Sequence, residues 1–193
     1  MVWTAIAYND GKRVKPVWDS KGFRFLTSTT SFSVPETDNP QLIWDMRGII
    51  RNRPDPSLLP FSSDGDTYVD FGLIWGEDII DLIMLDRGKV VLPLRNLQGF
   101  SELDIALNYA DDITIAIDWS QSVQSSSNDF SIDIVDLLKQ LHKRGQRNIL
   151  IYSLLGEYHY IPAGMTTNLN IKLVFLSDYR PPPQWARGVF VFE

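Results

Sequence analysis

Apolar strand-like runs alternate with helical stretches between Lys89 and Leu155, and this alternation limits the fold more than any other feature. The runs "KVVLPL", "DITIAID" and "RNILIYSLL" are short, apolar and bounded by turn signals, which is typical of buried strands. Between them, "FSELDIALNYA" and "NDFSIDIVDLLKQLHKRG" have the apolar spacing of helices. Crossovers of this kind join parallel strands, so the sequence predicts an α/β (or α+β) fold with a βαβαβ core in its C-terminal half.

The stretch from 128 to 145 is the clearest predicted helix. Asn128 is a suitable N-cap, basic side chains crowd the last turn, and Gly145 is a suitable stop. Five apolar residues fall on one face of this helix: Phe130, Ile134, Leu137, Leu138 and Leu141. Such a stripe indicates a helix that packs on the sheet.

The N-terminal third is predicted to be rich in β-structure. "VWTAIAY" and "RVKPVWD" flank the turn signal "NDGK", which favours a hairpin, and "GFRFLTSTTSFSV" alternates as a half-exposed strand does. Residues 40–52 are predicted to form a helix, because Leu42, Ile43, Met46, Ile49 and Ile50 share one helical face. The proline-rich stretch after them suggests a boundary, so we expect an N-terminal segment at 1–66 and an α/β core domain at 67–193.

The C-terminal tail contains further strand-like runs, "EYHYIPAG", "NIKLVFLSD" and "GVFVFE". No helix fits between them, which predicts antiparallel strands at an edge of the sheet.

The composition excludes several classes of function. The chain has 193 residues, no cysteine and a net charge of −6, so thiolate zinc sites, disulfides and thiol nucleophiles are impossible. Duplex nucleic acid is not expected as a partner, because phosphate binding needs clustered Lys and Arg. Neither a signal peptide nor an apolar run long enough to span a membrane is visible, and we therefore expect a cytoplasmic or virion location.

The stretch "IDWSQS" reads D-x-S-x-S and lies where a predicted strand ends, at the sheet edge where α/β proteins bind ligands. Asp118, Ser120 and Ser122 offer oxygens suited to Mg²⁺ or Mn²⁺. The pattern resembles the metal-ion-dependent adhesion site of von Willebrand A domains. That resemblance implies further ligands, for which Thr166 (or Thr167) and Asp178 stand in the right order.

Two other interpretations of Asp118 are open. The strand, terminal Asp and following loop also resemble PIN-like metal-dependent nucleases, in which a carboxylate cluster activates water. Alternatively, Asp118 simply ends a buried strand, and the Ser-rich stretch after it is a solvated loop.

The segment "DYRPPPQWARG" is an unusual surface signal, because its prolines favour an extended polyproline II conformation. Such a segment can bind an aromatic groove of a partner, or it can serve as a stiff link between two strands. The residues that would contact a partner are Tyr179, Arg180, Pro181, Pro182, Pro183 and Trp185.

The sequence shows no complete catalytic constellation. Together with the aromatic-rich strands and the "RPPPQW" segment, this favours a non-enzymatic structural or protein-interaction component of a larger assembly, such as a viral or phage particle. Its partners would be other proteins or copies of itself. The alternative function is divalent-metal binding at Asp118, adhesive or hydrolytic.

Overall fold

The computed structural model describes residues 1–31, 40–58, 66–84, 88–110, 113–176, 181 and 183–192. Its centre is a ring of eight parallel strands that follow one another in chain order. These are β1 (Val2–Asn9), β4 (Gln41–Asp45), β5 (Thr67–Asp70), β6 (Lys89–Pro93), β7 (Thr114–Ser120), β9 (Asn148–Ser153), β10 (Asn170–Phe175) and β11 (Gly188–Phe192). The ring is closed by β11, which pairs with β1 from Val189 opposite Val2 to Phe192 opposite Ala5.

This strand topology is that of the (β/α)8, or TIM, barrel. All eight pairings are parallel, neighbours in the ring are neighbours in the chain, and the register advances by eight residues in one circuit. The predicted α/β class with a parallel core is confirmed, and the structure adds that the sheet is closed. Closure defines two openings, one at the N-terminal and one at the C-terminal ends of the strands.

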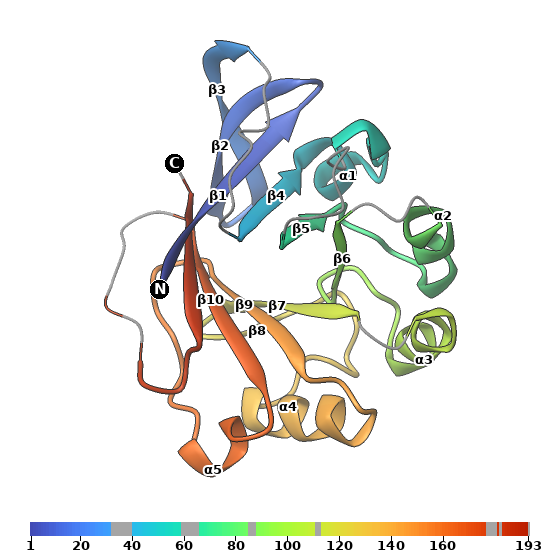
Figure 1. The fold of residues 1–193 in the computed structure, drawn as a ribbon, viewed down its shortest axis with the longest axis vertical. Coiled ribbons are helices and arrows are strands. Elements are labelled where there is room, and N and C mark those ends of the chain that lie inside the picture. The colour runs from blue at the N-terminus through green and yellow to red at the C-terminus, as the bar shows by residue number, and fades with distance from the viewer. Residues whose placement is uncertain are drawn as a thin grey trace.

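Short helices lie in several of the connections between strands, and α2, α3 and α4 lie around the outside of the ring (Figure 1). The helical elements are α1 (Met46–Arg51), η1 (Pro56–Leu58), η2 (Gly76–Asp78), α2 (Ile79–Ile83), α3 (Phe100–Tyr109), α4 (Ile134–Lys143) and α5 (Ala163–Thr166). Among the described residues, no helix is long and apolar enough to cross a membrane.

The barrel has two apolar layers, because successive side chains of each strand point to opposite faces. Inside the ring, small residues such as Ala5, Ala7 and Ala116 lie opposite large ones such as Trp44 and Phe190. Outside it, strand residues such as Ile115 and Ile151 pack against the stripe of α4, which buries Ile134, Leu137, Leu138 and Leu141. Both faces of the strands are therefore buried.

A β-hairpin, rather than a helix, connects β1 to β4. It consists of β2 (Lys12–Asp19) and β3 (Gly22–Ser31), and it stands at one end of the molecule (Figure 1). The rings of Trp18 and Phe23 are 4.8 Å apart, and Phe23 meets Trp44 of β4 edge to face at 5.1 Å. The hairpin turn therefore lies over the C-terminal opening of the barrel.

Three predictions of local structure were wrong. Residues 41–45 form β4 and only Met46–Arg51 are helical, because a strand buried on both faces is a continuous apolar run that also fits a helical face. The C-terminal strands β10 and β11 are parallel to their neighbours, not antiparallel. The expected division of the chain at residue 66 stays a prediction, and residues 1–66 supply β1 and β4, two of the eight barrel strands.

The third difference is the start of α4. The helix begins after Asp133, whose carboxylate accepts from Val135 N at 2.8 Å, and not after Asn128. Residues 128–132 make turns instead, and the Asp129 carboxylate accepts from the backbone N–H of Phe100 at the start of α3. This loop therefore ties α4 to α3.

Helix α3 approaches η2 so closely that Gly76 is required. A Cβ built on Gly76 would lie 2.0 Å from the carbonyl oxygen of Glu102, which is backbone and cannot rotate away. We expect Gly76→Ala to lower the free energy of unfolding by about 1–3 kcal/mol through overpacking, as measured by urea denaturation. The matched control is Gly164→Ala in α5, where the added Cβ meets nothing within 4 Å and stability should change little. Equal effects of the two substitutions would contradict the close contact.

Candidate functional site

The D-x-S-x-S motif forms a tight turn at the C-terminal opening of the barrel. Asp118 is buried inside the ring, and Gln121 adopts a φ of 62° that reverses the chain into β8 (Ser122–Gln124). Ser120 pairs with Ser122 across this turn, and Gln124 Nε2 donates to Ser122 Oγ at 3.1 Å. The motif is therefore part of the sheet and not an open loop.

Arg95 lies between two carboxylates at this end of the ring. Its Nε donates to Asp118 Oδ2 at 2.6 Å, and its Nη2 donates to Asp118 Oδ1 at 3.1 Å and to Asp70 Oδ2 at 2.9 Å. Arg95 is 7% exposed, Asp118 1% and Asp70 0%. We name these three residues the Arg95 cluster. It joins the segments at the ends of β5, β6 and β7.

Aromatic rings surround the guanidinium of Arg95. Its central carbon is 5.0 Å from the ring centroid of Phe23, 5.4 Å from that of Tyr152 and 5.6 Å from that of Trp44. Such rings exclude water and favour a cation over their faces. Phe23 comes from the hairpin, so the hairpin covers one side of the guanidinium.

The electrostatics of the cluster follow from burial and charge. The carboxylates of Asp118 and Asp70 raise the pKa of Arg95 against the opposing effect of its burial, so the guanidinium stays charged. Burial raises the pKa of Asp118, and the Arg95 charge opposes that shift. With one cation and two carboxylates, the Arg95 cluster can accept further hydrogen bonds but has little tendency to bind an anion.

Among the described residues, two polar atoms beside the cluster are buried and have no hydrogen-bond partner: Tyr152 Oη and Trp44 Nε1. Their rings are 4.8 Å apart and meet edge to face. Burial raises the pKa of Tyr152 well above its usual value, so its hydroxyl is neutral. Unpartnered buried polar groups are rare, and they cluster where a protein gives up stability for another purpose.

Asp45, at the end of β4, has a structural role close to this site. Its carboxylate accepts from Arg47 N at 3.0 Å, which caps α1, and from Asp55 N at 2.6 Å, which fixes the following loop. Burial raises its pKa. Its hydrogen bonds hold α1 beside the barrel opening.

A cavity of about 420 Å³ lies above the Arg95 cluster. The hairpin forms one wall, α1 another, and the segments that follow β6 and β8 the rest. The lining residues are Trp18, Lys21, Gly22, Phe23, Ile49, Ile50, Arg95, Asn96, Asp118, Gln124, Ser125 and Ser126. The volume falls within the range of small-molecule sites.

In the part of the chain that the structure describes, the predicted metal ligands are not assembled around Asp118. Both of its oxygens accept from Arg95, which supplies the positive charge that a cation would bring. Thr166 ends α5 shortly before the first residue of β10, so it lies toward the opposite opening of the barrel. Asp178 lies outside the described residues. Within the described ranges, no three His, Asp or Glu side chains are grouped to hold a metal ion.

The predicted partner-binding segment is described only in part. Tyr179, Arg180 and Pro182 lie outside the described residues, and Pro181 is exposed. Trp185 is buried in the outer apolar layer and meets the ring of Tyr158 at 6.2 Å. Trp185 is therefore a core residue and is not presented to a partner.

Sequence reasoning found Asp118 but missed Arg95, Asp70 and Tyr152. A signal for the first two was present, since "TYVD" and "KVVLPLR" each end an apolar run in a charged residue, as "TIAID" does. In parallel strands such terminal residues meet at one edge.

No protein-family model matches the chain, and no curated protein is significantly similar to it.

Removal of Arg95 should destabilise the protein strongly, because two buried carboxylates lose their cation. We expect Arg95→Met to lower the free energy of unfolding by about 3–5 kcal/mol in urea denaturation. The control is Arg144→Met, since Arg144 pairs with the exposed Asp104 and should cost about 1 kcal/mol.

A pH titration of the same variant provides a further control. Without Arg95, burial and the charge of Asp70 raise the pKa of Asp118 above its unfolded value, so the ionised form destabilises the fold at neutral pH. That cost disappears as the pH falls through the folded-state pKa. The stability gap between wild type and Arg95→Met should therefore narrow from pH 7 toward about pH 5. A gap that is constant over this range would contradict a charged cluster.

Proposed function

We propose that the protein binds a small, neutral, polar organic molecule in the cavity above the Arg95 cluster. The observation that carries this proposal is the cluster itself, a buried Arg between two buried carboxylates at the C-terminal opening of a parallel barrel. Proteins with this topology bind their ligands at that opening. Well-packed apolar residues in place of a buried charge network often make a protein equally stable or more stable. Stability alone therefore does not account for the Arg95 cluster, and a role in binding does.

The chemistry of the lining supports the ligand class. Trp18 and Phe23 offer apolar surface on one side, while Asn96, Gln124 and Ser126 offer neutral hydrogen-bonding groups on the other. Asp118 at the floor is an acceptor that already has a cation beside it. This combination suits a molecule with hydroxyl or amide donors and one flat face, such as a sugar or a nucleoside.

The proposal can be tested with Asn96→Ala, because Asn96 lines the cavity and is only half-buried. Glucose and adenosine serve as first probes, and tryptophan fluorescence, to which Trp18 contributes, reports binding. The loss of one neutral hydrogen bond should weaken binding by about twofold to tenfold. The control is Gln98→Ala, an exposed neighbour outside the lining, which should bind as the wild type does. A panel of neutral sugars and nucleosides without any fluorescence or thermal shift would refute the proposal.

We propose as a second function self-association through the outer surface of η2, α2 and α3. Copies of the same chain are one of the two kinds of partner expected from the sequence, the other being different proteins. These elements pack together, and Met84 is 78% exposed, Tyr109 53% and Trp75 47%. Ile105 is exposed on the same face of α3 as Tyr109, one turn away. Exposed large apolar side chains on elements that pack together support an interface.

Sedimentation measured over a range of concentrations tests this second function. If copies associate through this surface, Met84→Asp with Tyr109→Asp should shift the protein toward monomer, because a charge is costly in an apolar interface. The matched control is Leu155→Asp, which changes an exposed apolar residue outside these elements. A wild-type protein that is monomeric at all concentrations would exclude self-association.

A further inference from the structure

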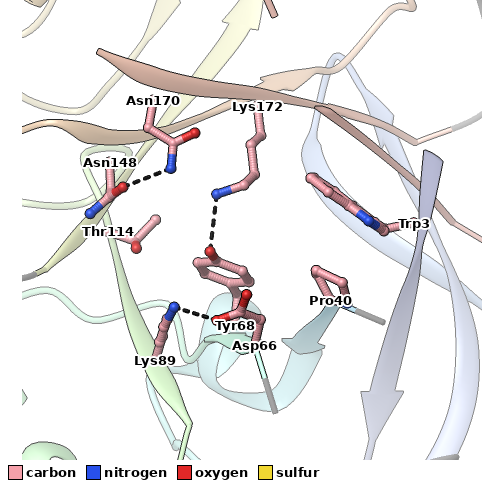
Figure 2. Close-up of a pocket in the computed structure, with 9 residues that line it drawn as sticks. All are labelled: Trp3, Pro40, Asp66, Tyr68, Lys89, Thr114, Asn148, Asn170 and Lys172. Carbon is pink, nitrogen blue, oxygen red and sulfur yellow. Dashed lines mark hydrogen bonds and ion pairs between the residues drawn. The ribbon is translucent and has the colours of Figure 1, made fainter. Parts of the chain in front are cut away.

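A second cavity, of about 370 Å³, lies at the N-terminal opening of the barrel. Its lining comes from residues at or near the starts of the strands: Trp3, Pro40, Asp66, Tyr68, Lys89, Thr114, Asn148, Asn170 and Lys172 (Figure 2). Most of these side chains are polar, whereas the layer above them inside the ring is apolar. The cavity is separate from the site at the C-terminal opening, and no part of the proposed function uses it.

Lys172 is the most unusual residue of this cavity. It is 7% exposed, and among the described residues its Nζ donates one hydrogen bond, to Tyr68 Oη at 3.0 Å. Its other close neighbours are the rings of Tyr68 and Trp3, at 4.8 and 6.0 Å from Nζ to the centroids. A hydroxyl and two ring faces do not neutralise a buried ammonium group, which retains two further N–H donors.

The one nearby carboxylate among the described residues is already engaged. Asp66 pairs with Lys89 Nζ at 2.5 Å, and this hydrogen bond lowers the pKa of Asp66. The charge of Lys172 contributes only weakly to that shift. The described lining therefore carries two ammonium groups and one carboxylate, so it has a net positive charge.

Amide and hydroxyl groups lie beside the ammonium group. Asn170 Nδ2 donates to Asn148 Oδ1 at 2.9 Å, which fixes the two amides relative to each other. Figure 2 shows Asn170, Asn148 and Thr114 on the same side of the cavity as Lys172 Nζ. Neutral donors grouped around one lysine are the arrangement that recognises oxygen anions in proteins.

We propose that the cavity at the N-terminal opening binds a small oxyanion, the phosphate or carboxylate group of a ligand, with Lys172 as its principal cation. The anion accepts a hydrogen bond from Lys172 Nζ and neutralises its positive charge, which the neutral hydroxyl of Tyr68 does not do.

The test measures the thermal stability of the full chain with inorganic phosphate, with succinate, and with sodium chloride at matched ionic strength. An anion that binds the folded state raises the melting temperature. Phosphate also stabilises proteins by being excluded from their surface, so variants must separate the two effects. The Lys172→Met variant should lose the oxyanion-specific rise in melting temperature, because its binding of the anion is at least about tenfold weaker. Without anion, its melting temperature should be no lower than that of the wild type.

Two further variants complete the design. Lys139→Met, in an exposed pair with Asp136 on α4, should keep the full shift. Lys172→Gln retains a donor for Tyr68 Oη without the charge, and it replaces Lys172→Met if that variant does not fold. Phosphate and succinate are compared to identify the anionic group. An equal shift in wild type and in the Lys172 variants, or no shift beyond that of chloride with either anion, would overturn the proposal.

Discussion

Pairing between β1 and β11 is the constraint on which the other features of the structure depend. Without it, the eight strands would form an open sheet with two unpaired edges, and the side chains of its inner face would have no enclosed space to fill. Closure gives that inner face a core in which Ala5 and Ala116 make room for Trp44 and Phe190. It also brings the strand ends together into two rims, and each rim has its own polar chemistry.

The buried cation at each opening has different partners. At the C-terminal opening, Arg95 has two carboxylates within hydrogen-bond distance, so the cation is fully matched and the excess charge is negative. At the N-terminal opening, Lys172 has only a tyrosine hydroxyl and aromatic faces among the described residues, and the excess charge is positive. The apolar layer between them prevents the two groups from neutralising each other. A neutral polar ligand at the C-terminal opening is therefore compatible with an oxyanion at the N-terminal opening.

The sequence predicted the parts of the fold in which local pattern and environment agree. The strands around Ile115 and Ile149 and the stripe of α4 are recognisable because each has a turn signal at both ends and one clear apolar period. Residues 41–45 were predicted to be helical because a strand that is buried on both faces has no alternation to read.

The candidate site was predictable only in part, for a related reason. Asp118 ends an apolar run and stood out, but its partners Asp70 and Arg95 are 48 and 23 residues away, and only the ring places them together. The D-x-S-x-S pattern suggested a cation, whereas the molecule supplies a guanidinium. Lys172 in "NIKLVF" was a signal that went unused, since a lysine inside an apolar strand run has to find polar partners within the fold.

The ladder that closes the ring also affects how the barrel forms. Val2 pairs with Val189, so the last neighbours to meet are almost the full chain apart in sequence. Every other pair in the ring joins segments that are close in the chain and can form earlier. The entropic cost of closing a loop grows only slowly with its length, so this separation lowers the stability little. It does delay the pairing of β1 with β11. During that delay both outer strands present unsatisfied backbone groups, and a second chain can pair with them. The same ladder that removes the edges from the finished barrel therefore leaves them exposed for longest while the chain folds.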